Sequence, residues 1–303
     1  MLGWRPKERL KGLVARLLRP AVEPHARASR ERAEAVERRL ARVEEVLERR
    51  LARAEELLEL VAGTTVDRDK HREELAFWRW LIRTEAGRAS LHAPFEEAFG
   101  GWQRERLVEL GAALGLGGAG DAALDAWCAE RSVVEIGAGP YPAVAAAPRW
   151  KRAVAVDPIA RAYVEEGLVP AAAGHVTYIE SPGERVPLPA GFADLVIIEN
   201  ALDHVSDPGA VLAEIRRLLG AGGLLWLLVD LSNYSDHMHP HPFNEERVRG
   251  LLAAAGFEAV SERVSDHKSH PKAYGEYRGL LRRVEGRAPG VPERVASPEE
   301  VKR

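Results

Sequence analysis

The chain has 303 residues, 46% of them hydrophobic, which is long enough for one or two domains with a sizeable core. Its formal net charge of −3 argues against binding of polyanions through bulk charge, so no nucleic-acid partner is expected. The single cysteine, Cys128, excludes an intramolecular disulfide framework and a zinc site built from several cysteines, and it fits a reducing compartment.

Residues 1–24 predict a short, basic amphipathic helix that ends at Pro20 and Pro24. One face is an apolar stripe formed by Leu10, Leu13, Val14, Leu17 and Leu18. The other face is basic, because six lysines and arginines stand against the single acid Glu8 in the first twenty residues. Two interpretations remain open: residues 1–20 lie on an anionic membrane surface, or the helix packs on protein.

No apolar run approaches the roughly 20 residues that span a bilayer, and the N-terminus has no apolar signal-peptide core. We therefore expect a cytoplasmic protein, with any membrane contact peripheral and at the inner face of the membrane.

Residues 25–63 predict a long helix, since neither glycine nor proline interrupts the chain from Ala26 to Ala62. Small or apolar residues recur at spacings of three and four: Ser29, Ala33, Val36, Leu40, Val43, Leu47, Leu51, Ala54, Leu58 and Val61. This is a heptad pattern with a stutter at Leu47 to Leu51, which favours a coiled coil and therefore a homo-oligomer. A single solvated helix stabilised by Glu–Arg pairs is the alternative.

Residues 64–130 are helical in pattern and rich in aromatic side chains, as expected for a lead-in or cap to a following domain. The predicted helices are Glu73–Ile82, Phe95–Leu114 and Asp121–Glu130. The glycine-rich stretch Gly111–Gly120 is interpreted as a linker, because it resembles no phosphate-binding motif.

Residues 131–285 change character: short β-branched runs alternate with helical patterns, which indicates an α/β domain with a mostly parallel sheet of seven strands. The predicted strands are Ser132–Ile136, Ala153–Val156, Val176–Ile179, Asp194–Glu199, Leu224–Val229, Phe257–Val264 and Tyr277–Val284. Asn244 is a good N-cap for a helix over Asn244–Ala255. Residues 286–303 are polar and read as a loose tail.

The first strand runs into a glycine turn, Gly137-Ala138-Gly139, where a backbone free of Cβ atoms can approach a nucleoside. The second strand ends at Asp157, an acid placed to accept hydrogen bonds from both ribose hydroxyls. A dinucleotide site would want a third glycine, but Tyr141 and Pro142 stand there. Glu135, just before the turn, also suits a cationic sulfonium better than a pyrophosphate. These features favour S-adenosylmethionine over NAD.

Five segments, in order and spacing, resemble the class I (Rossmann-like) S-adenosylmethionine-dependent methyltransferases, small-molecule branch. They are Glu135–Pro140, Val154–Asp157, Pro187–Ile198, Asn200–Pro208 and Leu218–Leu225. The resemblance covers roughly residues 131–264. It implies a seven-stranded Rossmann-like methyltransferase sheet preceded here by the long helical, coiled-coil N-terminal extension.

The resemblance also implies roles for the cofactor-binding residues. Glu135, Gly137 and Gly139 would line the methionine part of S-adenosylmethionine, and Asp157 would hold the ribose. Asn200, at the carboxyl end of the fourth strand, would complete the cofactor site.

The loop 180–184 would lie beside the adenine. Here the chain departs from the family, because Pro182 and Gly183 replace the usual acid followed by alanine. Glu184 or the Gly183 backbone are the candidates for the adenine contacts.

The acceptor side is expected after the fourth and fifth strands, where open α/β sheets bind ligands. Methyl transfer to a hydroxyl needs a group that takes up its proton, and histidine suits this role at neutral pH. The candidates are Asp203 and His204, followed by His237, His239 and His241, with Asp203, His204 and His239 taken as catalytic.

Each candidate has a second interpretation. His204 can simply orient its loop, and the later histidines can cap or pack. Three histidines at alternate positions also suggest a metal, but no further ligands follow at an obvious spacing, so no metal site is expected.

The predicted function is therefore methyl transfer from S-adenosylmethionine, most often to oxygen, on a small molecule, a glycan or a lipid-linked saccharide. The alternative is a coiled-coil scaffold with a degenerate, non-catalytic methyltransferase-like domain.

Overall fold

The structure is a computed structural model that describes residues 66–116, 121–147 and 149–284. The predicted basic helix 1–24, coiled coil 25–63 and tail 286–303 lie outside the described residues, so these remain predictions. Among the helices that are described, none combines the length and apolarity needed to cross a bilayer.

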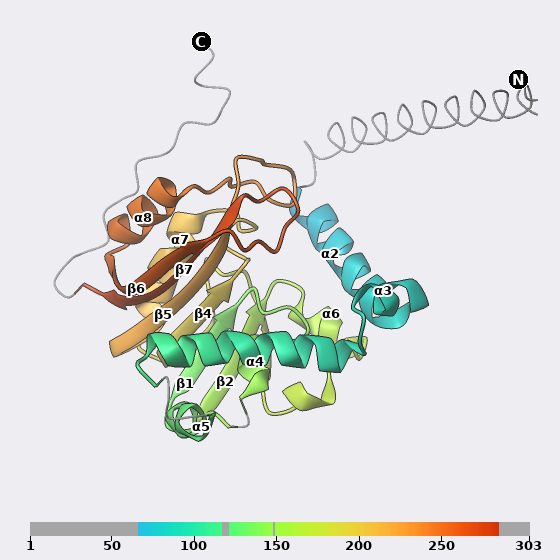
Figure 1. The fold of residues 1–303 in the computed structure, drawn as a ribbon, viewed down its shortest axis with the longest axis horizontal. Coiled ribbons are helices and arrows are strands. Elements are labelled where there is room, and N and C mark those ends of the chain that lie inside the picture. Colours follow the sequence, from blue (N-terminus) through green and yellow to red (C-terminus); the bar gives the residue numbers. More distant parts are fainter. Residues whose placement is uncertain (1–65, 117–120, 148, 285–303) are drawn as a thin grey trace, which may run out of the picture. The chain divides into compact units, whose positions relative to one another are not determined.

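The described chain starts with four helices and continues with seven strands, most of them separated by helices (Figure 1). In chain order they are α2 (Val66–Arg83), α3 (Glu85–Ser90), α4 (Phe95–Ala113), α5 (Asp121–Ala129), β1 (Ser132–Ile136), η1 (Ala143–Ala146), β2 (Arg152–Asp157), α6 (Ala160–Glu165), η2 (Ala171–Ala173), β3 (Thr177–Glu180), β4 (Ala193–Glu199), α7 (Pro208–Leu218), β5 (Leu219–Leu231), α8 (Glu245–Ala254), β6 (Phe257–Ser265) and β7 (Gly275–Arg283).

Each predicted strand forms at its predicted place, and β1 has the predicted bounds. The fifth strand is longer than expected, because Ala193 pairs with Leu219 while Leu195 pairs with Leu224. The residues between Leu219 and Leu224 therefore form an irregularity inside β5, with Gly222 at φ +71°, instead of a turn that precedes it.

The sheet has the strand order β3-β2-β1-β4-β5-β7-β6 and is mixed. Strands β1 to β5 pair in parallel, whereas β7 pairs antiparallel with both β5 and β6. The prediction of a mostly parallel sheet is corrected here. The segment 266–274 between β6 and β7 is shorter than the dozen or more residues that a parallel crossover needs, so the chain turns back on itself.

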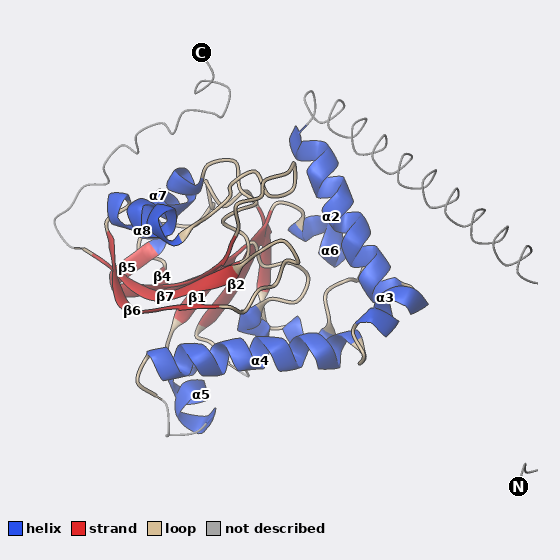
Figure 2. Cartoon of the chain, turned by 45° about the horizontal axis from the view of Figure 1, so that its top comes forward, coloured by secondary structure: helices blue, strands red, loops and turns tan. Residues whose placement is uncertain are grey.

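Helices cover both faces of the sheet, with α4 and α5 on one side and α7 and α8 on the other (Figure 2). Alternate side chains of each strand point to opposite faces. Val134 and Ile136 accordingly belong to the apolar cluster under α7 and α8, whereas Val133 packs with the cluster under α4 and α5.

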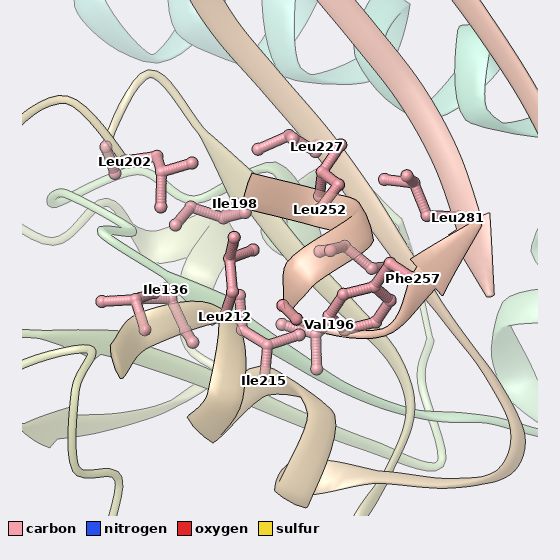
Figure 3. Close-up of a cluster of buried hydrophobic side chains, with 14 of the residues drawn as sticks. Ile136, Val196, Ile198, Leu202, Leu212, Ile215, Leu227, Leu252, Phe257 and Leu281 are labelled. Carbon is pink, nitrogen blue, oxygen red and sulfur yellow. The ribbon is translucent and has the colours of Figure 1, made fainter. Parts of the chain in front are cut away.

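The larger cluster lies between the sheet and α7, with Phe257 and Leu281 closing its far end (Figure 3). Leu212 and Ile215 of α7 are fully buried against Ile198 of β4. This packing anchors the carboxyl end of β4, from which the loop to α7 departs.

Helices α7 and α8 each begin at a side-chain cap. Asp207 accepts hydrogen bonds from the amides of Gly209 and Ala210 at the start of α7. Asn244 accepts from the amide of Arg247, which confirms the predicted cap of α8.

The strand order reverses direction beside β1, because the chain moves from β1 to β2 and β3 on one side and to β4 and β5 on the other. Open α/β sheets bind ligands at such a switch point, beyond the carboxyl ends of the strands. The residues after β1, β2 and β4 meet there.

Candidate active site

The turn after β1 requires glycine at its first position. Gly137 adopts φ +68°, and a Cβ added there would lie 2.2 Å from the Cβ of Ala201 in the loop after β4. The amide of Gly137 donates to the carbonyl of Val156, which ties the turn to β2. A larger residue would displace the β4 loop as well as the turn.

Asp157 joins the turns that follow β1 and β2. Its carboxylate accepts from the amide of Gly139 at 3.1 Å and from the amide of Ile159 at 3.0 Å, and the residue is 2% exposed. Burial, together with the nearby Glu74 carboxylate, raises the pKa of Asp157 to about 7, although both amides act to lower it.

A cavity opens beyond these turns, and it brings together six of the predicted site residues from four separate loops. Its wall includes Gly137, Asp157, Gly183, Glu184, Asn200 and His204. The roles that the sequence analysis assigns to them within a cofactor site remain predictions.

Helix α2 supplies the wall of this cavity that sequence reasoning missed. Lys70, His71 and Glu74 line it, and Lys70 donates to the backbone carbonyl of His204. Trp78, one turn after Glu74, packs close to Gly139. The sequence signals only that residues 64–130 form a cap, because the polar face of an amphipathic helix reads as solvated surface.

The cavity wall is acidic. Glu74, Asp157 and Glu184 contribute three carboxyl groups, against the ammonium of Lys70. Such a wall favours a cationic ligand over a pyrophosphate.

Glu135 lies beneath the glycine turn. Its carboxylate accepts from the amides of Ala143 and Val144, each at 2.9 Å, and thereby caps the first turn of η1. Burial is the main cause that raises the pKa of Glu135 to about 8. The structure thus shows this side chain supporting the loop, and its contact with the methionine part of a cofactor remains a prediction.

Tyr141, which stands near the place of the usual third glycine, is buried under α4. Its ring lies 6.1 Å from that of Phe95, and its carbonyl accepts from the side chain of Gln103 at 2.7 Å. The departure from the glycine pattern is therefore accommodated by helix α4.

On the expected adenine side, Gly183 packs tightly, since a Cβ added there would lie 2.8 Å from Ile136 Cγ2. Glu184 accepts from the amides of Ser206 and Asp207. The Glu184 carboxylate therefore links the loop after β3 to the loop after β4 while lining the cavity.

Asn200 adopts φ +46° at the end of β4, a backbone conformation that asparagine tolerates better than most residues. Its Nδ2 donates to Ser269 Oγ at 2.7 Å, and its buried Oδ1 has no partner among the described residues. Asn200 thus connects the cavity to the loop 266–274 at the acceptor side.

Three imidazoles pack against one another beside the cavity, one pair edge-to-face and the other tilted. The rings of His204 and His239 are 4.3 Å apart between centroids, and those of His239 and His270 are 4.7 Å apart. Asp203 Oδ2 lies 3.8 Å from His204 Nε2, and Asp236 Oδ1 lies 3.0 Å from His239 Nδ1. We call these five residues the histidine cluster. His204 belongs both to this cluster and to the cavity wall.

The predicted histidines at alternate positions do not act together. His237 pairs with Glu73 on α2 at 2.8 Å, and His241 lies 2.9 Å from the carbonyl of Val205, so only His239 enters the cluster. The predicted catalytic residues Asp203, His204 and His239 are brought together. His270 and Asp236 join them, although the sequence did not place either residue in the catalytic set. His239 lies far along the chain from His204, so spacing carried no signal for their contact.

The cluster is an unusual electrostatic environment. Burial, with the neighbouring His239 and Lys70, lowers the pKa of His204 to about 3. Burial raises the pKa of Asp203 to about 6. For Asp236 burial is outweighed by hydrogen bonds from the backbone and ring of His239, which lower its pKa to about 2. His204 is therefore neutral at physiological pH and too weak a base to hold a proton there.

The comparisons with known proteins agree with this architecture. Residues 134–227 match the family described as a methyltransferase domain. A relative described as an uncharacterized methyltransferase, from Mycobacterium sp. (strain JLS), is 33% identical over 143 residues. That match covers 47% of this chain and 53% of the relative, so the chain spans about half the length of the curated relative it matches.

Among solved structures, the 1,6-didemethyltoxoflavin-N1-methyltransferase of Burkholderia thailandensis, with its substrate and S-adenosylhomocysteine bound, has a TM-score of 0.45 and 20% identity, covering 60% of this chain and 78% of its own. The CalH methyltransferase complex with S-adenosylhomocysteine has a TM-score of 0.42 and 19% identity, covering 53% of each chain.

Residues 134–227 thus form a methyltransferase domain, as the sequence motifs predict. This confirms the predicted methyltransferase family for those residues, and S-adenosylmethionine as the methyl donor stays a prediction.

Proposed function

We propose that this chain, whose residues 134–227 are a methyltransferase domain, transfers a methyl group from S-adenosylmethionine to a hydroxyl oxygen of a small molecule, a glycan or a lipid-linked saccharide. The observation that carries the proposal is the continuity of two sites. The cavity built on Gly137 and Asp157 shares His204 with a cluster of imidazole and carboxylate groups.

In this proposal, the cofactor occupies the cavity. The acidic wall formed by Glu74, Asp157 and Glu184 attracts the sulfonium and ammonium charges of S-adenosylmethionine. Asp157 accepts the ribose hydroxyls, and the glycine turn allows the nucleoside to approach the backbone. Lys70 is the cationic member of the wall, and a methionine carboxylate is a natural partner for it.

The acceptor hydroxyl binds at the histidine cluster. The oxygen lone pair forms the new C–O bond while the electrons of the S–CH₃ bond move to sulfur, and the hydroxyl proton leaves at the cluster. The products are the methyl ether, S-adenosylhomocysteine and a proton. Alignment of donor and acceptor supplies much of the acceleration in such a reaction.

The cluster supports oxygen as the methylated atom. A hydroxyl must lose its proton for transfer, and the cluster offers groups that can accept one, the Asp203 carboxylate and the imidazoles of His239 and His270. A neutral amine would need less of this machinery, because its nitrogen is a good nucleophile before any proton is removed, whereas a neutral hydroxyl is a poor one.

The test combines binding with turnover. Calorimetric titration with S-adenosylhomocysteine, S-adenosylmethionine and NAD should show micromolar affinity for the first two and none for NAD. Methyl transfer from labelled S-adenosylmethionine is then measured on matched alcohols and amines, including sugars. Absence of S-adenosylhomocysteine binding would refute the proposal and favour the scaffold alternative, while transfer to amines alone would refute oxygen as the acceptor atom.

We further infer from the sequence that residues 25–63 pair in a homo-oligomer and that residues 1–20 contact an anionic membrane surface. A glycan or lipid-linked acceptor would suit such a placement.

A further inference from the structure

Three ligand groups converge in the histidine cluster. Asp203, His204 and His239 each offer one ligand atom, and the three atoms lie within 4.8 Å of one another. Two of these residues follow β4, and the third stands in the loop after β5. Two imidazoles and one carboxylate form a donor set that first-row transition metals bind, leaving coordination positions open.

The second observation is independent of this spacing. Asp203 is 9% exposed, and its Oδ1 is buried without a hydrogen-bond partner among the described residues. Buried carboxylate oxygens normally accept hydrogen bonds, because an oxygen buried without a partner loses its hydrogen bonds to water and gains none in return. A cation bound by both oxygens of the Asp203 carboxylate, beside the two imidazoles, would supply the partner that Oδ1 lacks.

The surrounding groups orient the imidazoles for binding a metal. Asp236 Oδ1 lies 3.0 Å from His239 Nδ1, so a proton on Nδ1 leaves the Nε2 lone pair free to coordinate. Metal-bound histidines commonly carry such a carboxylate partner on the second nitrogen.

The spacing of two of the ligand atoms and the charge around them suit a divalent ion. Two atoms that each lie about 2.1 Å from one ion can be at most about 4.2 Å apart, and Asp203 Oδ2 and His204 Nε2 are 3.8 Å apart. Three carboxylates, from Asp203, Asp230 and Asp236, act on the cluster, against the cations of Lys70 and Lys272.

We propose that Asp203, His204 and His239 bind one divalent first-row transition-metal cation beside the cofactor cavity. The role of this ion rests on the proposed function: it would bind the acceptor oxygen, lower the pKa of the hydroxyl and release its proton to water. Its binding, in contrast, can be measured without turnover. The sequence predicts no metal, because the spacing of His237, His239 and His241 offers no further ligands and the fold separates these three histidines.

The experiment uses the full chain, stripped with a chelator and titrated calorimetrically with Zn²⁺. One Zn²⁺ per chain is expected, with affinity lost in Asp203→Asn and His239→Ala. Asp236→Asn should weaken Zn²⁺ binding about 10–100-fold, since it removes only the partner of a ligand. His237→Ala is the matched control from the same loop, and it should bind Zn²⁺ like the parent.

Two further measurements keep the test decisive. Thermal melting of each metal-free variant verifies folding, and His239→Gln replaces His239→Ala if the latter does not fold. Co²⁺ added in place of Zn²⁺ should give visible absorption bands that disappear in Asp203→Asn and persist in His237→Ala.

The proposal is overturned if the stripped protein binds no Zn²⁺, or if Asp203→Asn and His239→Gln bind it as His237→Ala does. S-adenosylhomocysteine is titrated into the same samples, so that failure of one proposal can be told from failure of the other. If the protein binds S-adenosylhomocysteine but not Zn²⁺, only the metal proposal is refuted. If it binds Zn²⁺ but not S-adenosylhomocysteine, only the proposed function is refuted.

Discussion

Asp157→Asn should sharply weaken cofactor binding. The Asp157 carboxylate already accepts two amides, from Gly139 and Ile159, and the proposed ribose hydroxyls would use its remaining lone pairs. The amide substitution removes the charge and turns one acceptor oxygen into a donor. Each hydrogen bond to a charged acceptor contributes about 1.5–3 kcal/mol. One ribose bond is therefore lost and the other loses its charged acceptor; the first loss alone costs about 1.5–3 kcal/mol, or roughly 10–10²-fold in Kd.

Calorimetric titration with S-adenosylhomocysteine measures this loss. The new NH₂ group also faces one of the two backbone amides, and two donors that face each other destabilise the variant. Its titration is therefore carried out well below its own Tm. Asp194→Asn is the matched control, because Asp194 also accepts a backbone amide, that of Ser132, but at the opposite end of β1. It should bind as the parent does. A Kd for Asp157→Asn within twofold of the parent would show that the ribose does not bind at this carboxylate.

Three further predictions concern the turn, the buried acid and the N-terminal segment. Gly137→Ala should abolish cofactor binding and lower the Tm, because its Cβ would lie 2.2 Å from that of Ala201. Gly222→Ala, at a similar positive φ with open space around it, controls for backbone strain and should leave binding intact; equal behaviour of the two variants would contradict the steric argument. Because burial raises the pKa of Glu135 from 4.5 to about 8, its contribution to stability is present below pH 4.5 and lost as pH rises through about 8. Melting curves should therefore show the parent losing stability between these values, by about 5 kcal/mol at most, and Glu135→Gln should flatten this dependence; an unchanged slope would mean that Glu135 is not its source. Deletion of residues 1–65 should leave S-adenosylhomocysteine binding intact, because α2 begins after the cut, and should lower the oligomeric state measured by light scattering. Equal subunit numbers in both proteins would refute the coiled coil, and retained attraction to anionic vesicles at low salt would refute the membrane role of residues 1–20.

Short-range sequence patterns were enough to predict the strands, one helix cap and two site residues of the methyltransferase domain. Runs of buried β-branched residues predicted the strands, since a strand flanked by helices on both faces is apolar throughout. Asn244 predicted a helix start because its side chain caps the helix within three residues. Gly137 and Asp157 were found for a similar reason: a glycine turn and an acid directly after strands are local signals, and parallel strands bring their carboxyl ends to one edge.

The tertiary structure decided what depends on residues distant in sequence. The short connection after β6 reverses β7, which no residue pattern within β7 reveals. The polar face of α2 became a cavity wall because the helix packs across the glycine turn, bringing Glu74 near Asp157. His239 lies close to Asp203 and His204 because β4 and β5 are neighbours in the sheet. The loops that follow these two strands therefore lie at the same edge. Sequence spacing records distance along the chain, whereas the chemistry of this cluster depends on distance in space.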